Sequence, residues 1–227
     1  MVKDPYRKFA AHYDRLVGPF TNALRHIGMK MYSPEPGMKV LEVGCGTGKN
    51  LMLHRQARCR VYGIDLSPSM LEVARTKLGE DAGLQLGDAS HMPYQDNFFD
   101  FTMAMFALHE MPRETRPLVM REMIRVTKQE GRVLIIDFHP GPIRFPKGWL
   151  YKAVILFIER VAGREHFSNY RDFLSQKGLP RLIETQKLIV DRQKIVSAGN
   201  IAFFLIKPKQ KNSGSIVDVS ERRNRVS

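Results

Sequence analysis

Short apolar runs alternate with segments of good helix formers through the middle of the chain. The first run breaks at Gly44 and the second ends at Asp65, as expected of buried strands that lead into turns. The expected strands cover residues 40–43, 60–65, 84–89, 99–108 and 132–138. The expected helices between them cover residues 49–57, 68–77 and 114–127. This alternation predicts a parallel sheet with helices on both faces.

The ends of the chain follow other patterns. Two β-rich runs, residues 187–196 and 201–207, are separated by turn-forming residues and predict an antiparallel hairpin. Residues 9–31 have apolar side chains spaced by three or four positions, which is typical of an amphipathic helix. Because proline disrupts a helix interior, Pro19 is expected to split this segment into two helices.

The segment of residues 149–161 is the most apolar stretch outside the expected strands. On a helical wheel its apolar positions cover more than half of the circumference, and only Lys152, Glu159 and Arg160 mark a polar edge. It is too short to span a bilayer. Two interpretations remain open, a buried helix that covers the active site and an interfacial helix that contacts lipid or a lipophilic substrate.

The loop after the first strand contains glycines at positions 44, 46 and 48. Glycine lets the backbone approach a ligand closely, and the following helix places its N-terminus beside that ligand. The spacing matches neither a dinucleotide fingerprint nor a phosphate-binding loop. Glu42, just before the loop, disfavours a phosphate and favours a cationic ligand. The alternative is a purely structural turn.

Polar residues also follow the other parallel strands. Asp65, Asp88 and His109 all fall at the carboxyl ends of strands, where ligands bind in open α/β sheets. Asp65 lies 17 residues beyond Gly48, close to the interval at which an acid reaches ribose hydroxyls in nucleotide sites. The pattern therefore predicts one binding site along this edge of the sheet.

The composition excludes several classes of protein. A chain of 227 residues with 43% hydrophobic residues is expected to form one globular domain and is too apolar for a disordered protein. No apolar run is long enough to span a membrane. Charged residues interrupt the first part of the chain, whereas a secretory signal has a continuous apolar region there. Two cysteines, Cys45 and Cys59, provide neither a disulfide framework nor a zinc site, so a cytoplasmic protein is expected.

The formal net charge of +13 is unevenly distributed. Residues 32–143 carry 13 Lys or Arg against 14 Asp or Glu, so the excess of positive charge lies in the flanks. Basic flanks can be solvated surface, can bind anionic lipid or can bind nucleic acid. No nucleic-acid-binding motif is visible, and the apolar segment 149–161 favours peripheral contact with an anionic membrane, at its inner surface.

Five segments in order, VLEVGCGTG, GIDLSPSML, GDASHMP, FALHEM and EMIRVTKQEGRVLIIDF, resemble the class I S-adenosylmethionine-dependent methyltransferases. The resemblance covers roughly residues 36–139 and is strongest to the ubiquinone/menaquinone-biosynthesis group. Bacterial phospholipid N-methyltransferases are also similar. The resemblance implies a doubly wound α/β fold, Rossmann-like, with a seven-stranded, mostly parallel sheet, a C-terminal antiparallel hairpin and N-terminal helices.

The resemblance also implies which residues hold S-adenosylmethionine. Asp65 would bind the ribose hydroxyls, Leu66 and Met70 would flank the adenine, and Asp88 would accept from its amino group. Tyr13 would belong to a helix that covers the cofactor, or would only pack on the sheet. The implied set is Tyr13, Glu42, Gly44, Gly46, Gly48, Asp65, Leu66, Met70, Asp88, Ala89 and Phe106.

The expected organisation is a single methyltransferase domain over residues 1–207, followed by a disordered basic tail. Within the domain we expect four parts with successive roles. They are an N-terminal helical lid at 1–35, a cofactor-binding core at 36–139, a helical substrate cap at 140–185 and a terminal hairpin at 186–207, with the tail at 208–227.

Methyl transfer by in-line displacement needs mainly alignment, but a neutral acceptor must still lose a proton. His109 is the best candidate for the base, ahead of His139 and Glu110, unless it only packs or caps. No metal ligand set is expected. The acceptor is expected to be lipophilic, a quinol ring carbon or a phospholipid amine. The alternatives are a soluble small molecule, a nucleic acid, and cofactor binding without catalysis.

Overall fold

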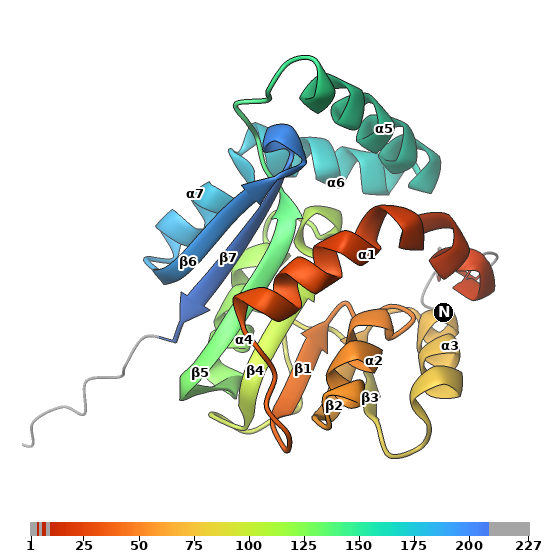
Figure 1. The fold of residues 1–227 in the computed structure, drawn as a ribbon, viewed down its shortest axis with the longest axis vertical. Coiled ribbons are helices and arrows are strands. Elements are labelled where there is room, and N and C mark those ends of the chain that lie inside the picture. Colours follow the sequence, from red (N-terminus) through yellow and green to blue (C-terminus); the bar gives the residue numbers. More distant parts are fainter. Residues whose placement is uncertain (1–3, 5, 8–9, 209–227) are drawn as a thin grey trace, which may run out of the picture.

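The computed structural model describes residues 4, 6–7 and 10–208, which build one seven-stranded sheet flanked by helices (Figure 1). The order across the sheet is β3-β2-β1-β4-β5-β7-β6. The strands from β1 to β5 are parallel, and β7 runs antiparallel between β5 and β6. The predicted fold class is therefore confirmed. The strands are β1 (Lys39–Val43), β2 (Arg60–Asp65), β3 (Gly83–Leu86), β4 (Phe99–Met105), β5 (Thr127–Phe138), β6 (Ile189–Val196) and β7 (Ile201–Lys207).

Helices cover both faces of the sheet and its upper edge. Figure 1 shows α1 crossing in front of the sheet and α4 behind it, while α5 and α6 lie above the carboxyl ends of the strands. The α-helices are α1 (Tyr13–Met31), α2 (Lys49–Gln56), α3 (Pro68–Leu78), α4 (Thr115–Val126), α5 (Lys147–Ala162), α6 (Arg164–Ser175) and α7 (Gly178–Thr185). Three short 3-10 turns complete the structure: η1 (Ala10–His12), η2 (Leu108–Glu110) and η3 (Ser197–Gly199).

The centre of the sheet forms the core. In β5, the side chains from Val133 to Ile136 are at most 1% exposed, because helices cover both faces of this strand. Such strands are continuous apolar runs rather than alternating ones. The edge strand β6 is mostly exposed and carries charged residues, which discourage pairing with another sheet.

The prediction that Pro19 splits the N-terminal segment is wrong, because α1 runs unbroken through it. A proline inside a helix costs about 3 kcal/mol, mainly through one lost hydrogen bond and a steric clash. The buried face of α1 offsets that cost. Leu24 is buried there, and Gly28 approaches the sheet so closely that a Cβ on it would lie 3.3 Å from the side chain of Ile136.

Several strand ends differ from the expected ones. β4 ends at Met105 instead of residue 108, since Phe106 has a φ of 55° that no strand accommodates. β3 ends at Leu86, before the expected residue 89. β5 starts at Thr127, where the register with β4 shifts between Phe99 and Phe101. The earlier ends of β3 and β4 leave Asp88 in a loop and His109 in the 3-10 turn η2, at the upper edge of the sheet.

The apolar segment predicted at 149–161 is the helix α5, but it is not a buried helix. Trp149, Phe157 and Val161 are 59%, 70% and 72% exposed, whereas Glu159 is only 5% exposed. Glu159 of the polar edge therefore faces inward, Arg160 is exposed, and much of the apolar face is turned outward. Within the described residues, no helix has the length and apolar character needed to cross a bilayer. The predicted basic tail lies outside the described residues except for Pro208.

Candidate functional site

A cavity of about 800 Å³ opens at the carboxyl ends of the strands. Its wall comprises the glycine loop after β1, the ends of β2 and β4, and residues of α1 and α6. This size is typical of small-molecule sites. All of the residues predicted to hold the cofactor line the cavity except Gly48. The local motifs therefore converge on one site, as the fold requires.

Two of the three loop glycines are needed for close packing. Gly44 has a φ of 65°, and a Cβ on it would lie 2.7 Å from the Cβ of Ala107. Gly48 has a φ of 73°, and its Cβ would lie 2.8 Å from a methyl group of Leu78. Gly44 thus lets the loop pass the end of β4, whereas Gly48 lets it pack on α3, away from the cavity.

Asp65 holds the loop in place from the end of β2. One carboxylate oxygen accepts from the backbone N–H of Gly46 at 2.7 Å, and the other accepts from the N–H of Ser67 at 2.8 Å. Burial raises the pKa of Asp65, although these backbone hydrogen bonds oppose the shift. The side chain thus joins the glycine loop to the start of α3 and still lines the cavity.

Glu42 lines the cavity from β1 and is almost completely buried. Its Oε1 accepts from the Asn50 side chain at 2.5 Å, while its Oε2 is buried without a hydrogen-bond partner among the described residues. Burial raises the pKa of Glu42 to about 8. A buried acceptor without a donor is costly, and a cationic ligand in the cavity would satisfy it.

The raised pKa of Glu42 predicts that a proton is released when the cofactor binds. With a pKa of about 8 the carboxyl is mainly protonated at pH 7, and a cationic ligand beside it lowers that pKa. Binding of S-adenosylmethionine should therefore release a proton below pH 8, and affinity should rise as the pH approaches 8. Calorimetry at pH 7 in two buffers of different ionisation enthalpy measures the release. The Glu42→Gln variant has no titrating side chain at this position, so its proton release measures the contribution of the ligand's own amino group. Equal proton release by the two proteins would contradict the prediction.

The start of α1 covers the loop. Tyr13 lines the cavity, and the next residue, Asp14, accepts from the Thr47 hydroxyl at 2.6 Å and pairs with Lys77 at 2.5 Å. Burial tends to raise the pKa of Asp14, but the hydrogen bonds from Lys77 and Thr47 lower it below its usual value. The contacts join α1, the glycine loop and α3 above the cavity.

His109, the predicted base, does not line the cavity. It is 1% exposed, with Nδ1 2.8 Å from Asp137 and Nε2 3.5 Å from Glu159. Burial by itself lowers the pKa of His109, but these carboxylates raise it well above its ordinary value. His139 is also outside the lining. Glu110 lies in the wall, where the Tyr6 hydroxyl donates to it at 2.7 Å.

Several lining residues had no signal in the sequence. Arg25 comes from α1, Asn50 from α2, and His166 and Asn169 from α6. Each is an ordinary polar residue on a helix, and only the packing of that helix turns it toward the cavity. Asn50 could be recognised only through its hydrogen bond to Glu42, which the fold creates.

The donor set fits the expected cofactor. S-adenosylmethionine carries a sulfonium cation, and the cavity presents the unpartnered carboxylate oxygen of Glu42 beside the glycine loop, where no described atom lies within 4 Å of the position that a Cβ on Gly46 would take. Asp65 adds a second carboxylate, which lines the cavity while it accepts from the backbone of the glycine loop. Glu42, Asp65 and Asp88 would hold the cofactor, with Tyr13 above it.

Comparison with known proteins identifies similar methyltransferases. A methyltransferase domain model matches residues 41–135. The chain is 36% identical over 155 residues to methyltransferase GfsG of Streptomyces halstedii, covering 64% of the chain and about half, 54%, of that relative. It is 32% identical to demethylmenaquinone methyltransferase of a Geobacillus strain, over 76% of the chain and 77% of the relative.

A solved S-adenosylmethionine-dependent methyltransferase from Aquifex aeolicus has the same fold. Its TM-score is 0.57 at 22% identity, covering 82% of this chain and 89% of that one. The relatives, the fold and the lining of the cavity agree on the cofactor and on the reaction it supports. The chain therefore belongs to the class I S-adenosylmethionine-dependent methyltransferases.

Proposed function

We propose that the protein methylates a lipophilic acceptor, and that the acceptor atom is a carbon of a quinol ring. The observation that carries the proposal is the outward apolar face of α5. Trp149, Leu150, Phe157 and Val161 are all strongly exposed, and large exposed apolar patches mark lipid, ligand or protein contacts. The end of this helix, at Ala162, reaches the wall of the cavity.

Charge and relatives support the same proposal. Lys147 and Arg160 are exposed on α5 together with the apolar residues, a combination typical of interfacial helices. Relatives named demethylmenaquinone methyltransferase align over about three quarters of the chain. A ring of that chemical class on a long apolar tail would reach the cavity past α5 while its tail stays in the membrane.

The residues around the cavity can serve such a reaction. S-adenosylmethionine, when bound, supplies an electrophilic methyl group. Glu42 and Asp65 hold and orient it, and the apolar side chains of Met105 and Phe106 limit water near the reacting atoms. Glu110 is better placed than His109 to take the acceptor's proton, because only Glu110 lines the cavity. Glu110→Gln should therefore lower kcat and leave cofactor affinity unchanged.

The direct test is incubation with methyl-labelled S-adenosylmethionine and a total lipid extract, followed by chromatography. We expect label in the neutral quinone fraction after alkali treatment. Label in phospholipid head groups would favour an amine acceptor, and label only in water-soluble material would contradict a lipophilic acceptor.

The role of α5 has its own test. The double variant Trp149→Ser and Phe157→Ser should lose at least about tenfold in binding to anionic vesicles at low salt, because two large apolar side chains no longer leave water. The matched control is Ile189→Ser, a 49% exposed apolar residue on the edge strand β6. Absence of vesicle binding by the unsubstituted protein would remove membrane contact from the proposal.

A further inference from the structure

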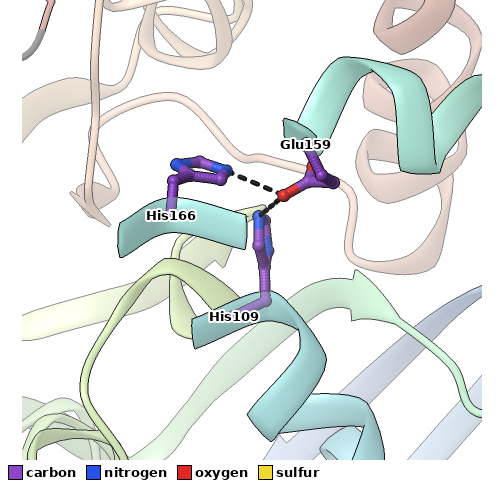
Figure 2. A group of neighbouring side chains, drawn as sticks. All are labelled: His109, Glu159 and His166. Carbon is purple, nitrogen blue, oxygen red and sulfur yellow. Dashed lines mark ion pairs between the residues drawn. The ribbon is translucent and has the colours of Figure 1, made fainter. Parts of the chain in front are cut away.

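Three side chains from separate elements converge beneath the helices above the cavity. Figure 2 shows His109 of η2, Glu159 of α5 and His166 of α6 pointing toward one another. Glu159 Oε2 lies 3.5 Å from Nε2 of His109 and 2.8 Å from Nε2 of His166. One ligand atom from each residue lies within 4.8 Å of the others. The cluster is buried, except that His166 also lines the cavity.

The geometry differs from that of an ordinary ion pair. Both imidazoles meet the same carboxylate oxygen, yet this buried oxygen has no hydrogen-bond partner of acceptable geometry among the described residues. In a hydrogen bond the ring N–H points nearly along the line to the acceptor. Nε2 of His166 lies 2.8 Å from Oε2 but off that line, and Nε2 of His109 is 3.5 Å away, at the outer limit of a hydrogen bond, so both nitrogens are placed as ligand atoms around a shared centre would be.

Asp137 fixes the orientation of His109 from behind. Its Oδ1 lies 2.8 Å from Nδ1 of the imidazole, and its Oδ2 accepts from the backbone N–H groups of Leu108 and His109. This contact holds a proton on Nδ1 and turns Nε2 toward Glu159, where a metal ion would replace the second proton of the ring. Histidines that bind metals commonly donate their other ring nitrogen to a carboxylate in this way.

We propose that His109, Glu159 and His166 bind a divalent transition metal ion such as Zn²⁺ through Nε2, Oε2 and Nε2. Ligand atoms that share a tetrahedral ion at bonds of ~2.0–2.1 Å lie roughly 3.4 Å apart. The two nitrogen–oxygen distances here, 2.8 and 3.5 Å, bracket that value. Two imidazoles and one carboxylate form a donor set that suits zinc and its neighbours better than magnesium or calcium.

Three protein ligands leave a coordination position open. Because His166 also lines the cavity, an ion here can present that position to a bound ligand. The charge around the cluster also favours a bound cation, since Asp137, Glu159 and Glu110 place three carboxyl groups around the two imidazoles. The metal would also tie α5 and α6 to the core, which couples binding to stability. Metal binding does not depend on which methyl acceptor the enzyme uses.

The test uses the full chain without a histidine tag, stripped with a chelator and desalted. Titration with Zn²⁺ against a chromophoric competitor should give one equivalent per chain, without S-adenosylmethionine or acceptor. Glu159→Gln and His166→Asn should each weaken binding by at least about 100-fold, and Asp137→Asn by roughly 10–100-fold. The matched controls are Glu184→Gln and His26→Asn, at exposed positions, and should bind as the unsubstituted protein does.

A second measurement needs no variant and so does not depend on how well the substituted proteins fold. Co²⁺ added to the unsubstituted protein should give the intense visible absorption of a four-coordinate site, and Zn²⁺ should abolish it and raise the Tm. Absence of both the single equivalent and the cobalt absorption would overturn the proposal. Binding that survives both ligand substitutions would overturn it equally. The cluster would then be an ion-pair network that holds α5 and α6 on the core.

Discussion

Replacing Asp65 by alanine is expected to lower the affinity for S-adenosylmethionine roughly 100-fold. The substitution leaves the N–H groups of Gly46 and Ser67 without their buried acceptor, and the glycine loop loses its tie to β2. It also removes the carboxylate expected to bind the ribose. Hydrogen bonds to charged groups contribute about 1.5–3 kcal/mol each, so a loss of about 3 kcal/mol is a conservative sum.

Isothermal calorimetry with S-adenosylmethionine or its demethylated product measures this loss. The matched control is Asp81→Ala, because the Asp81 side chain is 73% exposed and pairs with Arg55 at the surface. The control should bind as the unsubstituted protein does, and circular dichroism should show both variants folded. An Asp65→Ala protein that binds within threefold of the unsubstituted one would contradict the assignment.

Gly44→Ala is expected to lower the free energy of unfolding by about 3 kcal/mol. A left-handed conformation costs a residue with a Cβ about 1–2 kcal/mol, and forcing extra volume into a packed site adds about 1–3 kcal/mol. Both costs apply, since Gly44 has a φ of 65° and its new Cβ would lie 2.7 Å from that of Ala107. Urea denaturation followed by circular dichroism measures the change.

Gly37→Ala separates the two costs. Gly37 has a φ of 87°, also left-handed, but no atom of the residues that the structure describes lies within 4 Å of the position its Cβ would take. Its substitution should cost only the conformational part, about 1–2 kcal/mol. Equal losses in the two variants would mean that the approach of the loop to Ala107 contributes nothing to the effect of Gly44→Ala.

The fold and the cofactor half of the site were predictable because both depend on local sequence. A buried parallel strand is a continuous apolar run, and a loop that bends back beneath a ligand needs glycine at positions such as Gly44. Asp65 is the last residue of β2 and Asp88 lies two residues beyond β3, and the carboxyl ends of parallel strands meet at one edge. Spacing along the chain therefore translated into position in space, and only Gly48 turned away from the cavity.

Strand and helix ends were predicted less well, because packing competes with local preference. Pro19 favours a break, but the buried face of α1 keeps that helix continuous. Phe106 continues an apolar run, but its left-handed backbone ends β4 beside the close approach of Gly44 to Ala107. In both places the contact that decides the outcome comes from an element distant in the sequence.

Local patterns were enough to predict the sheet, the glycine loop and the acids that line the cavity, since backbone geometry and apolar periodicity act over a few residues. The surroundings of His109 and the orientation of α5 depend instead on packing between distant elements. Glu159 is on the polar edge of an apolar helix, and that pattern does not distinguish a solvated edge from a buried one. The fold buries it between His109 and His166 and turns Trp149 outward. A carboxylate so placed is stable only because groups from other elements meet its charge, and that is a property of the assembled chain.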